Sequence, residues 1–340
     1  MKFSIIIPVR NCIEYLERSI YSIVAQNFKS YEIIIVDDGS TDGTLELARK
    51  MSESNSHIRV ISQIHLGVSV ARNKAIKSAI GDYLIFCDAD DWYEDNALNI
   101  LSKIIDEDDY DIIFFAYYKY FKDKSKVLHK YKDYKDKSFS DKSDFLSIQY
   151  YIMNAINPGG TALFLTLWTG CYKREFVVKN ELQMIPNLQK SEDQLFNLEC
   201  LDKVSKIRYT PIPLYNYFYN PQSACNRIRE DIVEIQEFFM KELKKYIQEN
   251  HSDDPIFLKG LYDWSYFSLK SILDNIKTVS YSNFKKYLSK VYNSELLTIP
   301  LKKNYPPIEH RKGKRNYIIF ICLKFHITYI VYKMLRYNSK

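Results

Sequence analysis

Blocks of apolar residues alternate with amphipathic segments along the first hundred residues. Period-two and continuous apolar runs predict strands, and apolar residues at spacings of three and four predict helices. The predicted strands are Phe3–Val9, Glu32–Val36, Arg59–Ser62 and Tyr83–Cys87, and the predicted helices are Glu14–Gln26, Thr41–Met51, Ser69–Ile80 and Asn96–Ile105. This order predicts an α/β fold, a Rossmann-like, mixed but mainly parallel sheet flanked by helices. Ligands of such sheets bind beyond the carboxyl ends of the strands.

The pattern changes after residue 105. An apolar strand is predicted at Asp111–Tyr117, followed by Lys122–Lys142, a polar stretch that indicates a solvated hairpin or loop. Asn157–Gly160 reads as a turn, and Ala162–Trp168 is apolar enough to lie beneath the ligand-binding edge. Residues Ile228–Leu297 predict helices, and so a C-terminal helical appendage.

Composition and charge narrow the class of protein. The chain has 340 residues with 29 Tyr and 19 Phe, which is typical of a globular protein. Six scattered cysteines without metal-binding spacing, and no secretory signal at the N-terminus, indicate a reducing, cytoplasmic setting. From Lys302 onward, ten Lys and Arg residues face a single Glu, although the whole chain carries only +6. This basic, partly apolar tail favours anionic lipid over nucleic acid as a partner.

Carboxylates gather where two predicted strands end. Asp88, Asp90 and Asp91 follow one strand, and Asp37 and Asp38 end another. Like charges this close repel one another, so a divalent cation would stabilise them, and oxygen ligands favour Mg²⁺ or Mn²⁺. In the alternative interpretation, Asp91 caps a helix beginning near Tyr93, the other two acids of its group face water, and Asp37 and Asp38 bond their own turn.

Five motifs occur in a fixed order. They are SIIIPVRN (4–11), IIVDDGSTDGT (34–44), GVSVARN (67–73), DADD (88–91) and SEDQLF (191–196). Together they resemble the family 2 glycosyltransferases of the GT-A fold, inverting enzymes that use nucleotide diphosphate sugars. The resemblance implies a non-processive hexosyltransferase of the kind that builds bacterial cell-surface polysaccharide. It also implies a catalytic domain over 1–225, in which 1–105 bind the donor and 106–225 the acceptor. The sequence pattern adds a helical region over 226–300 and a basic amphipathic tail over 301–340.

The resemblance assigns roles on the donor side. Pro8, Val9 and Arg10 line the pocket for the base, and Asp38, with Asp37 beside it, contacts the base or ribose. The first βα turn lacks the glycines of a dinucleotide-binding fingerprint, which argues against a nicotinamide enzyme. We expect Arg72 to pair with a phosphate or to hold the aspartates, the alternative being a surface arginine. Asp88 and Ala89 contact the nucleotide sugar, and Asp90 with Asp88 binds Mn²⁺ or Mg²⁺.

On the acceptor side, the resemblance makes Asp193 the general base, supported by Glu192. Inversion requires a carboxylate to take the proton of the attacking hydroxyl. Ser191–Gln194 also has the pattern of a helix capping box, which is compatible with catalysis because a cap would fix the position of Asp193.

Two departures from the family stand out. Trp168–Tyr172 keeps the aromatic residues of a family segment and lacks its lysine. Phe218 stands where many members carry an arginine, and we expect Arg227 or Arg229 to replace that cation.

The last segment, Tyr317–Tyr337, is apolar but interrupted by charges, which predicts an interfacial helix and not a membrane span. The alternative is a terminal helix packed on its own domain or on a partner. We therefore expect a peripheral protein on the inner face of the cell membrane, attached through 311–340. Its partners would be the donor and a saccharide or polyprenyl-diphosphate-linked acceptor, with no nucleic acid. The competing classes are a nucleotide-sugar-binding scaffold without turnover and a sugar-phosphate nucleotidyltransferase, although the latter needs a glycine-rich loop that PVRNC does not supply.

Overall fold

The computed structural model describes residues 1–131, 135–154, 163–219, 228–303 and 314–336. It divides into two compact units, which are treated separately below. The first consists of Met1–Gln149 with Gly160–Asn220, and the second of Tyr150–Gly159 with Pro221–Lys340. The roles expected for the parts of the chain, including the donor and acceptor halves and the tail, stay predictions. The expected turn at 157–160 lies outside the described residues.

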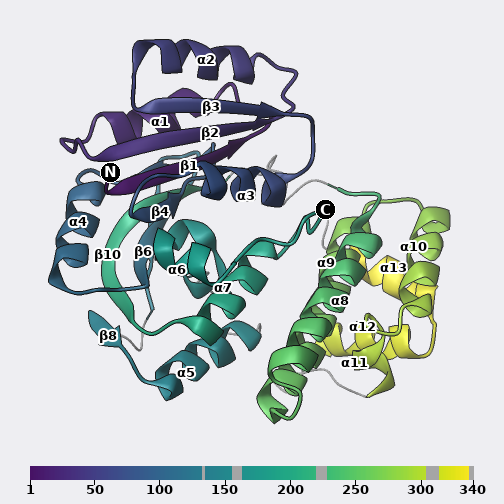
Figure 1. Cartoon of the computed structure of the whole chain (residues 1–340). Helices are drawn as coiled ribbons and strands as arrows, with labels where there is room; N and C mark the ends of the chain where they lie inside the picture. The colour runs from purple at the N-terminus through teal and green to yellow at the C-terminus, as the bar shows by residue number, and fades with distance from the viewer. Residues whose placement is uncertain (132–134, 155–162, 220–227, 304–313, 337–340) are drawn as a thin grey trace. The chain divides into compact units, whose positions relative to one another are not determined.

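The first unit opens with the alternation predicted from the sequence. Its elements are β1 (Phe3–Val9), α1 (Leu16–Val24), β2 (Tyr31–Asp38), α2 (Thr44–Ser54), β3 (Ile58–Gln63), α3 (Val68–Ser78) and β4 (Tyr83–Phe86). The strands lie in the order β3-β2-β1-β4, all parallel, with Ile5 beside Ile33 and Ile85. In Figure 1, α3 lies in front of β1 and β2, and α1 lies behind them. Helices on both faces bury the isoleucines of the central strands completely.

The remaining elements extend this sheet with strands of both directions. They are β5 (Trp92–Tyr93), α4 (Ala97–Glu107), β6 (Ile112–Tyr120), β7 (Lys126–His129), β8 (Lys137–Phe139), α5 (Lys142–Met153), η1 (Leu163–Leu165), η2 (Leu167–Thr169), β9 (Gly170–Lys173), α6 (Arg174–Lys179), α7 (Glu192–Lys203) and β10 (Ile207–Phe218). The sheet continues β4-β9-β6-β10-β5, with β7 on β6 and β8 on β10. The α/β fold with a mixed, flanked sheet is thus confirmed, and its antiparallel pairs lie in the second half.

The polar stretch 122–142 begins with the expected hairpin, because β7 pairs antiparallel with β6, and its other strand, β8, pairs with β10. One local expectation is wrong. No helix begins at Tyr93, since Trp92 and Tyr93 form the short strand β5 and α4 begins at Ala97. Asp91 therefore does not cap a helix.

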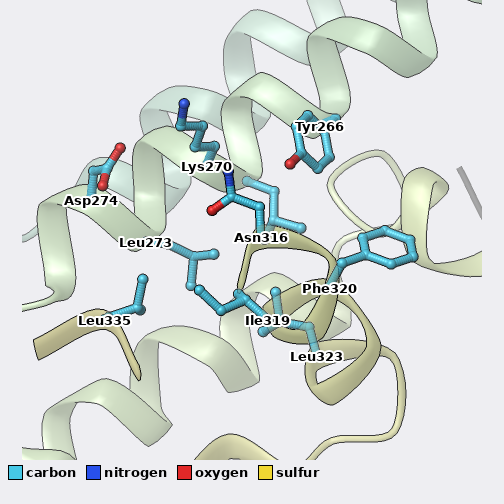
Figure 2. Close-up of a pocket in the computed structure, with 10 residues that line it drawn as sticks. Tyr266, Lys270, Leu273, Asp274, Asn316, Ile319, Phe320, Leu323 and Leu335 are labelled. Atoms are coloured by element: carbon cyan, nitrogen blue, oxygen red, sulfur yellow. The ribbon is translucent and has the colours of Figure 1, made fainter. Parts of the chain in front are cut away.

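The second unit is helical. It contains α8 (Ile232–Asn250), α9 (Pro255–Ile276), α10 (Tyr281–Asn293), α11 (Ile299–Lys302), α12 (Lys314–Lys324) and α13 (Thr328–Arg336). The predicted single tail helix is two, divided at His326, which has a positive φ of 57°. Leu273 of α9, Ile319 and Leu323 of α12, and Leu335 of α13 line an apolar cavity of about 70 Å³ (Figure 2). Within the described residues, none of the helices combines the length and the hydropathy that a bilayer span requires.

Candidate active site

Two loops meet at the carboxyl ends of β1 and β2. The backbone N–H of Asn11 donates to the Ser40 hydroxyl over 3.0 Å, and the Asn11 side chain accepts from the Thr41 N–H over 2.9 Å. Asp42 accepts from the N–H groups of Ile13 and Thr44. The expected base-pocket residues border this junction: Val9 is buried, Pro8 partly exposed and Arg10 exposed. The motifs SIIIPVRN and DDGSTDGT are therefore one structural piece.

Asp37 and Asp38 differ in what their oxygens contact. One oxygen of Asp37 accepts from Gly39 N and Ser40 N, as the turn interpretation predicts, and the other is buried without a hydrogen-bond partner. An orphaned buried carboxylate oxygen is costly and is often found where a ligand binds. This orphan is the local feature that fits recognition of a base or ribose by Asp37.

Asp38 already has a full set of partners within the protein. Its oxygens accept from Gln63 Nε2, His65 Nδ1, Leu66 N and Gly67 N over 2.7–3.0 Å. Burial opposes ionisation of Asp38, but these hydrogen bonds prevail and lower its pKa. The backbone comes close here, because a Cβ on Gly39, whose φ is +74°, would lie 2.9 Å from His65 N. Asp38 thus holds the loop before α3, and its contact with the base stays a prediction.

Arg72 on α3 bridges the two acidic motifs. Its Nη2 donates to Asp88 Oδ1 and its Nη1 to Glu192 Oε1, each over 2.9 Å. The side chain is only 4% exposed, so the surface-arginine interpretation is wrong and the ion pairs are with carboxylates. Burial opposes its charge, yet Asp88 and Glu192 raise the pKa of Arg72 above its ordinary value. The donor-side strand end and the start of α7 are thereby joined through one guanidinium.

Two neighbours of Arg72 on the same helix face reinforce this connection. The Ser69 hydroxyl donates to the Leu188 carbonyl, and the Asn73 amide exchanges two hydrogen bonds with the backbone of Met184. Positions 69, 72 and 73 have the i, i+3, i+4 spacing of one helical face. The sequence reasoning used only Arg72, although this polar spacing within GVSVARN was a readable signal. The face fixes the segment that leads into α7.

Helix α7 presents Glu192 and Asp193 in its first turn. Asn197 anchors α7 to the sheet and to η1: it accepts from the Tyr172 hydroxyl over 2.8 Å and donates to the Phe164 carbonyl over 2.9 Å. The predicted capping box is wrong: Ser191 has a φ of 64° and its side chain makes no cap hydrogen bond. Packing and the Arg72 bridge, rather than a cap, hold this turn.

Asp193 is a strong acid–base candidate by its surroundings. It keeps part of its surface exposed. Burial, and then the negative charge of Glu192, raise its pKa to about 7, while Arg72 acts in the opposite direction. A carboxylate with a pKa near neutral pH suits proton transfer.

The DADD motif divides into three environments. Asp88 has a one-third exposed side chain with one oxygen on Arg72, and Ala89 is buried beside it. Burial and the charge of Asp88 raise the pKa of Asp90 to about 6. Asp91 is fully buried and accepts from the Tyr215 hydroxyl and from Phe218 N, over 2.8 and 2.7 Å. Asp91 therefore holds β10 against the motif and does not reach a ligand.

Asp88 and Asp90 are the acids of the motif that could hold a divalent cation. Among the described residues, no cluster of three or more His, Cys, Asp or Glu side chains is arranged to hold a metal. Mg²⁺ usually takes one or two carboxylates together with water and substrate phosphates, so two acids suffice. Burial, and then the charge of Asp88, disfavour ionised Asp90 and raise its pKa, and a bound cation would stabilise the ionised form.

Arg18 of α1 is a site residue that the sequence reasoning missed. Its Nη2 donates to the Asp90 carbonyl over 2.6 Å, and its guanidinium lies over the rings of Trp92 and Phe218, at 4.1 and 4.8 Å. Of the two arginines expected to replace the cation missing at Phe218, Arg227 lies outside the described residues. Arg229 pairs with Asp231 in the second unit.

Comparison with known proteins finds that the chain is similar to glycosyltransferases. The chain is 33% identical over 221 residues to the cholesterol galactosyltransferase of Borreliella burgdorferi, covering 64% of this chain and 59% of that protein. It thus spans about three fifths of the length of that relative. Residues 1–349 of TarS of S. aureus, solved with UDP-GlcNAc, superpose with a TM-score of 0.58 at 18% identity, covering 100% of this chain and 92% of that fragment. A mannosyltransferase of Pyrobaculum calidifontis, solved with GDP-Man and Mn²⁺, reaches a TM-score of 0.51 at 13% identity, with 98% and 84% covered.

At these identities the two solved structures support the fold alone, and they confirm the predicted GT-A arrangement. The sequence pattern that defines the family described as Glycosyl transferase family 2 matches residues 4–177, slightly more than half of the chain. It takes in four of the five motifs that carried the resemblance. The chain therefore belongs to glycosyl transferase family 2.

Proposed function

We propose that this protein is an inverting glycosyltransferase that moves a sugar from a nucleotide diphosphate sugar to a saccharide or a lipid-linked saccharide. The observation that carries the proposal is the Asp88–Arg72–Glu192 bridge, which joins the strand-end acids to the turn that bears Asp193. Donor-side and acceptor-side carboxylates at one sheet edge are what a direct displacement at the anomeric carbon requires. UDP is the favoured nucleotide because TarS was solved with UDP-GlcNAc.

Asp88 and Asp90 are the residues that would hold Mn²⁺ or Mg²⁺. Such a cation neutralises negative charge on the departing nucleotide diphosphate. The Mn²⁺ complex of the archaeal mannosyltransferase supports the same choice of metal. Asp37, through its buried unpartnered oxygen, and the loop that Asp38 orders would receive the nucleoside.

Asp193 would accept the proton of the acceptor hydroxyl as that oxygen attacks. Its partial exposure admits an acceptor, and its pKa of about 7 lets it bind a proton and release it again near neutral pH. Glu192 is engaged with Arg72 and so supports the turn instead of competing for the proton. Residues that hold a base in place matter because small misplacements cost large factors in rate.

The test is release of nucleotide diphosphate from a panel of UDP-, GDP- and dTDP-sugars with Mn²⁺, with and without saccharide acceptors. We expect turnover of one donor that Asp90→Ala abolishes and Asp193→Asn reduces strongly. Arg49→Met, an exposed arginine on α2, serves as the surface control. Donor binding without turnover for any acceptor would favour the scaffold alternative.

We further propose that α12 and α13 attach the protein to an anionic membrane surface, which suits a lipid-linked acceptor. Large apolar side chains are exposed on these helices and on the turn between them, namely Tyr317, Ile318, Phe325, Ile327, Tyr329 and Ile330. Residues 314–336 carry five Lys and Arg and no acid. The buried side of the helices packs within the second unit through residues such as Phe320 and Val331. An exposed apolar face with basic residues is typical of interfacial binding. The name of the Borreliella relative, which gives cholesterol as its acceptor, also favours a lipid.

Vesicle co-sedimentation tests the attachment. Full-length Phe325→Ser/Ile330→Ser should bind vesicles with 30% phosphatidylglycerol roughly tenfold more weakly than the wild type, because two apolar side chains are lost from the interface. Ile256→Ser/Leu258→Ser removes two exposed apolar residues of α9 and should bind normally. Equal binding by all three proteins would contradict the attachment.

A further inference from the structure

The Arg18 guanidinium lies at the same sheet edge as the acidic motif. Helix α1 follows β1, and β1 pairs in parallel with β4, whose carboxyl end leads into Asp88–Asp91. The first turn of α1 therefore lies beside that motif, and the hydrogen bond from Arg18 to the Asp90 carbonyl makes the contact direct.

Three aromatic rings fix the orientation of this guanidinium. Its central carbon lies 4.1 Å from the Trp92 ring, 4.8 Å from the Phe218 ring and 5.7 Å from the Tyr15 ring. Trp92 and Phe218 are also in contact with each other. Planar stacking and cation–π attraction hold an arginine in one place more firmly than solvent would. The charge is thus positioned in advance of any ligand.

The same guanidinium keeps most of its donors for a ligand. Arg18 is exposed, and within the described residues its one hydrogen bond is to a neutral carbonyl and it takes part in no ion pair. An arginine has five N–H donors in a fork that matches phosphate oxygens. Arg72, whose guanidinium also reaches the motif, spends its fork on Asp88 and Glu192. Arg18 is therefore a cation beside the motif that is open to an anion.

We propose that Arg18 binds the diphosphate of the donor, beside the place where Asp88 and Asp90 would hold the metal. This inference rests on the proposed function and adds a binding residue to it. It also gives Phe218 a role, because the ring of Phe218 supports the guanidinium of Arg18.

Calorimetric titrations of the full-length protein test this assignment. The wild type is titrated with UDP, GDP and dTDP, and the nucleotide that binds most tightly is compared with its nucleoside. Arg18→Met keeps an apolar stem over the rings and removes the charge. It should weaken diphosphate binding roughly tenfold and leave nucleoside binding within twofold. Arg18→Lys should bind the diphosphate with an affinity between those of the wild type and Arg18→Met. Arg49→Met should bind it as tightly as the wild type does.

A second comparison separates direct binding from support of the Asp90 loop. In EDTA, Arg18→Met should still weaken diphosphate binding, because the contact is with the phosphates. A loss confined to titrations with Mn²⁺, or an equal loss for nucleoside and diphosphate, would mean that Arg18 only positions the motif, and would overturn the inference. If the wild type binds no nucleotide diphosphate at all, both the proposed function and the role of Arg18 are contradicted. If the wild type binds and Arg18→Met binds equally well, only the role of Arg18 fails.

Discussion

Buried charges at the two edges of the parallel strands differ in how fully they are paired. At the amino edge, Glu32 of β2 accepts from the Ser4 hydroxyl over 2.6 Å, from Ile80 N over 2.8 Å and from Arg59 Nη1 over 2.7 Å. Ser4 accepts in turn from Gly81 N over 2.9 Å. Each oxygen of the buried carboxylate thus has a partner, and together these bonds join four neighbouring segments.

The carboxyl edge is incompletely paired. One oxygen of Asp37 and Nε of Arg72 are buried without hydrogen-bond partners. Burial and neighbouring acids raise the pKa of Asp90 to about 6 and that of Asp193 to about 7. Ser191, directly before Glu192, has the left-handed φ of 64°, which costs free energy for a residue with a side chain.

The contrast separates charges that stabilise the fold from charges that are held ready for a ligand. A satisfied buried carboxylate contributes stability, and removing it leaves its donors unpaired. An unsatisfied cluster stays at a cost in stability that substrate or metal binding can offset. We therefore expect substitutions at the amino edge to change stability and those at the carboxyl edge to change activity.

The largest effect is expected for Asp193→Asn. The amide cannot accept the proton of the acceptor hydroxyl, so kcat should fall by a factor of about 10²–10⁴. Thermal unfolding checks the other half of the comparison, because losing a carboxylate whose pKa is raised in the fold should not lower the melting temperature. A variant that keeps more than a tenth of the wild-type kcat would remove Asp193 from the mechanism.

Glu32→Ala should have the opposite effect: it should lower stability and leave activity nearly unchanged. Its loss leaves the Ser4 hydroxyl, Ile80 N and Arg59 without their acceptor, at a cost of about 3 kcal/mol. Urea unfolding in a Trp264→Phe background measures it, because Trp92 and Trp168 then report on the first unit alone. The kcat of the folded variant should stay within twofold of wild type, and a large drop in kcat at unchanged stability would contradict the division between the edges.

Arg72→Lys should have the smallest of these effects. It should lower kcat/KM and change how the rate depends on pH. One ammonium cannot reach Asp88 and Glu192 with the geometry of a forked guanidinium, so we expect roughly a tenfold loss of kcat/KM. Arg72 lowers the pKa of Asp193, so weakening that interaction should move the rising limb of the pH–rate profile to higher pH. An unchanged profile would show that the bridge does not influence the base.

The sequence predicted the parallel half of the fold well because its pattern is local. The strands β1 to β4 and the helices between them follow from apolar periodicity, and β1 matches its expected bounds. Strand β10 was missed because Pro211 and Pro213 interrupt a run that otherwise reads as a strand. The structure accommodates them through register shifts against β6.

At the site, the motifs predicted which residues gather at one edge, but not how they are paired. The bridge from Arg72 to Glu192 joins positions 120 residues apart, and no local pattern indicates it. Arg18 was missed for the same reason, since an isolated arginine on an amphipathic helix reads as a surface residue. The capping box predicted at Ser191 was wrong because that pattern considers only local residues. The segment before α7 is held instead by Ser69 and Asn73, and Ser191 takes a left-handed backbone conformation.

The most direct test of the account is kcat/KM and stability measured across pH 5–8 on the same protein, with the donor that the panel identifies. Asp193 must lose its proton to act as base, so kcat/KM should rise with pH and level off above about 7. The unfolded chain releases this proton near pH 3.8 and the folded protein only near 7, so the metal-free free energy of unfolding should fall as pH rises between them. Asp90 contributes in the same direction, so Asp193→Asn should reduce the fall without abolishing it. Activity that rises while stability falls supports a carboxyl edge built for proton transfer, and a flat kcat/KM over this range would contradict it.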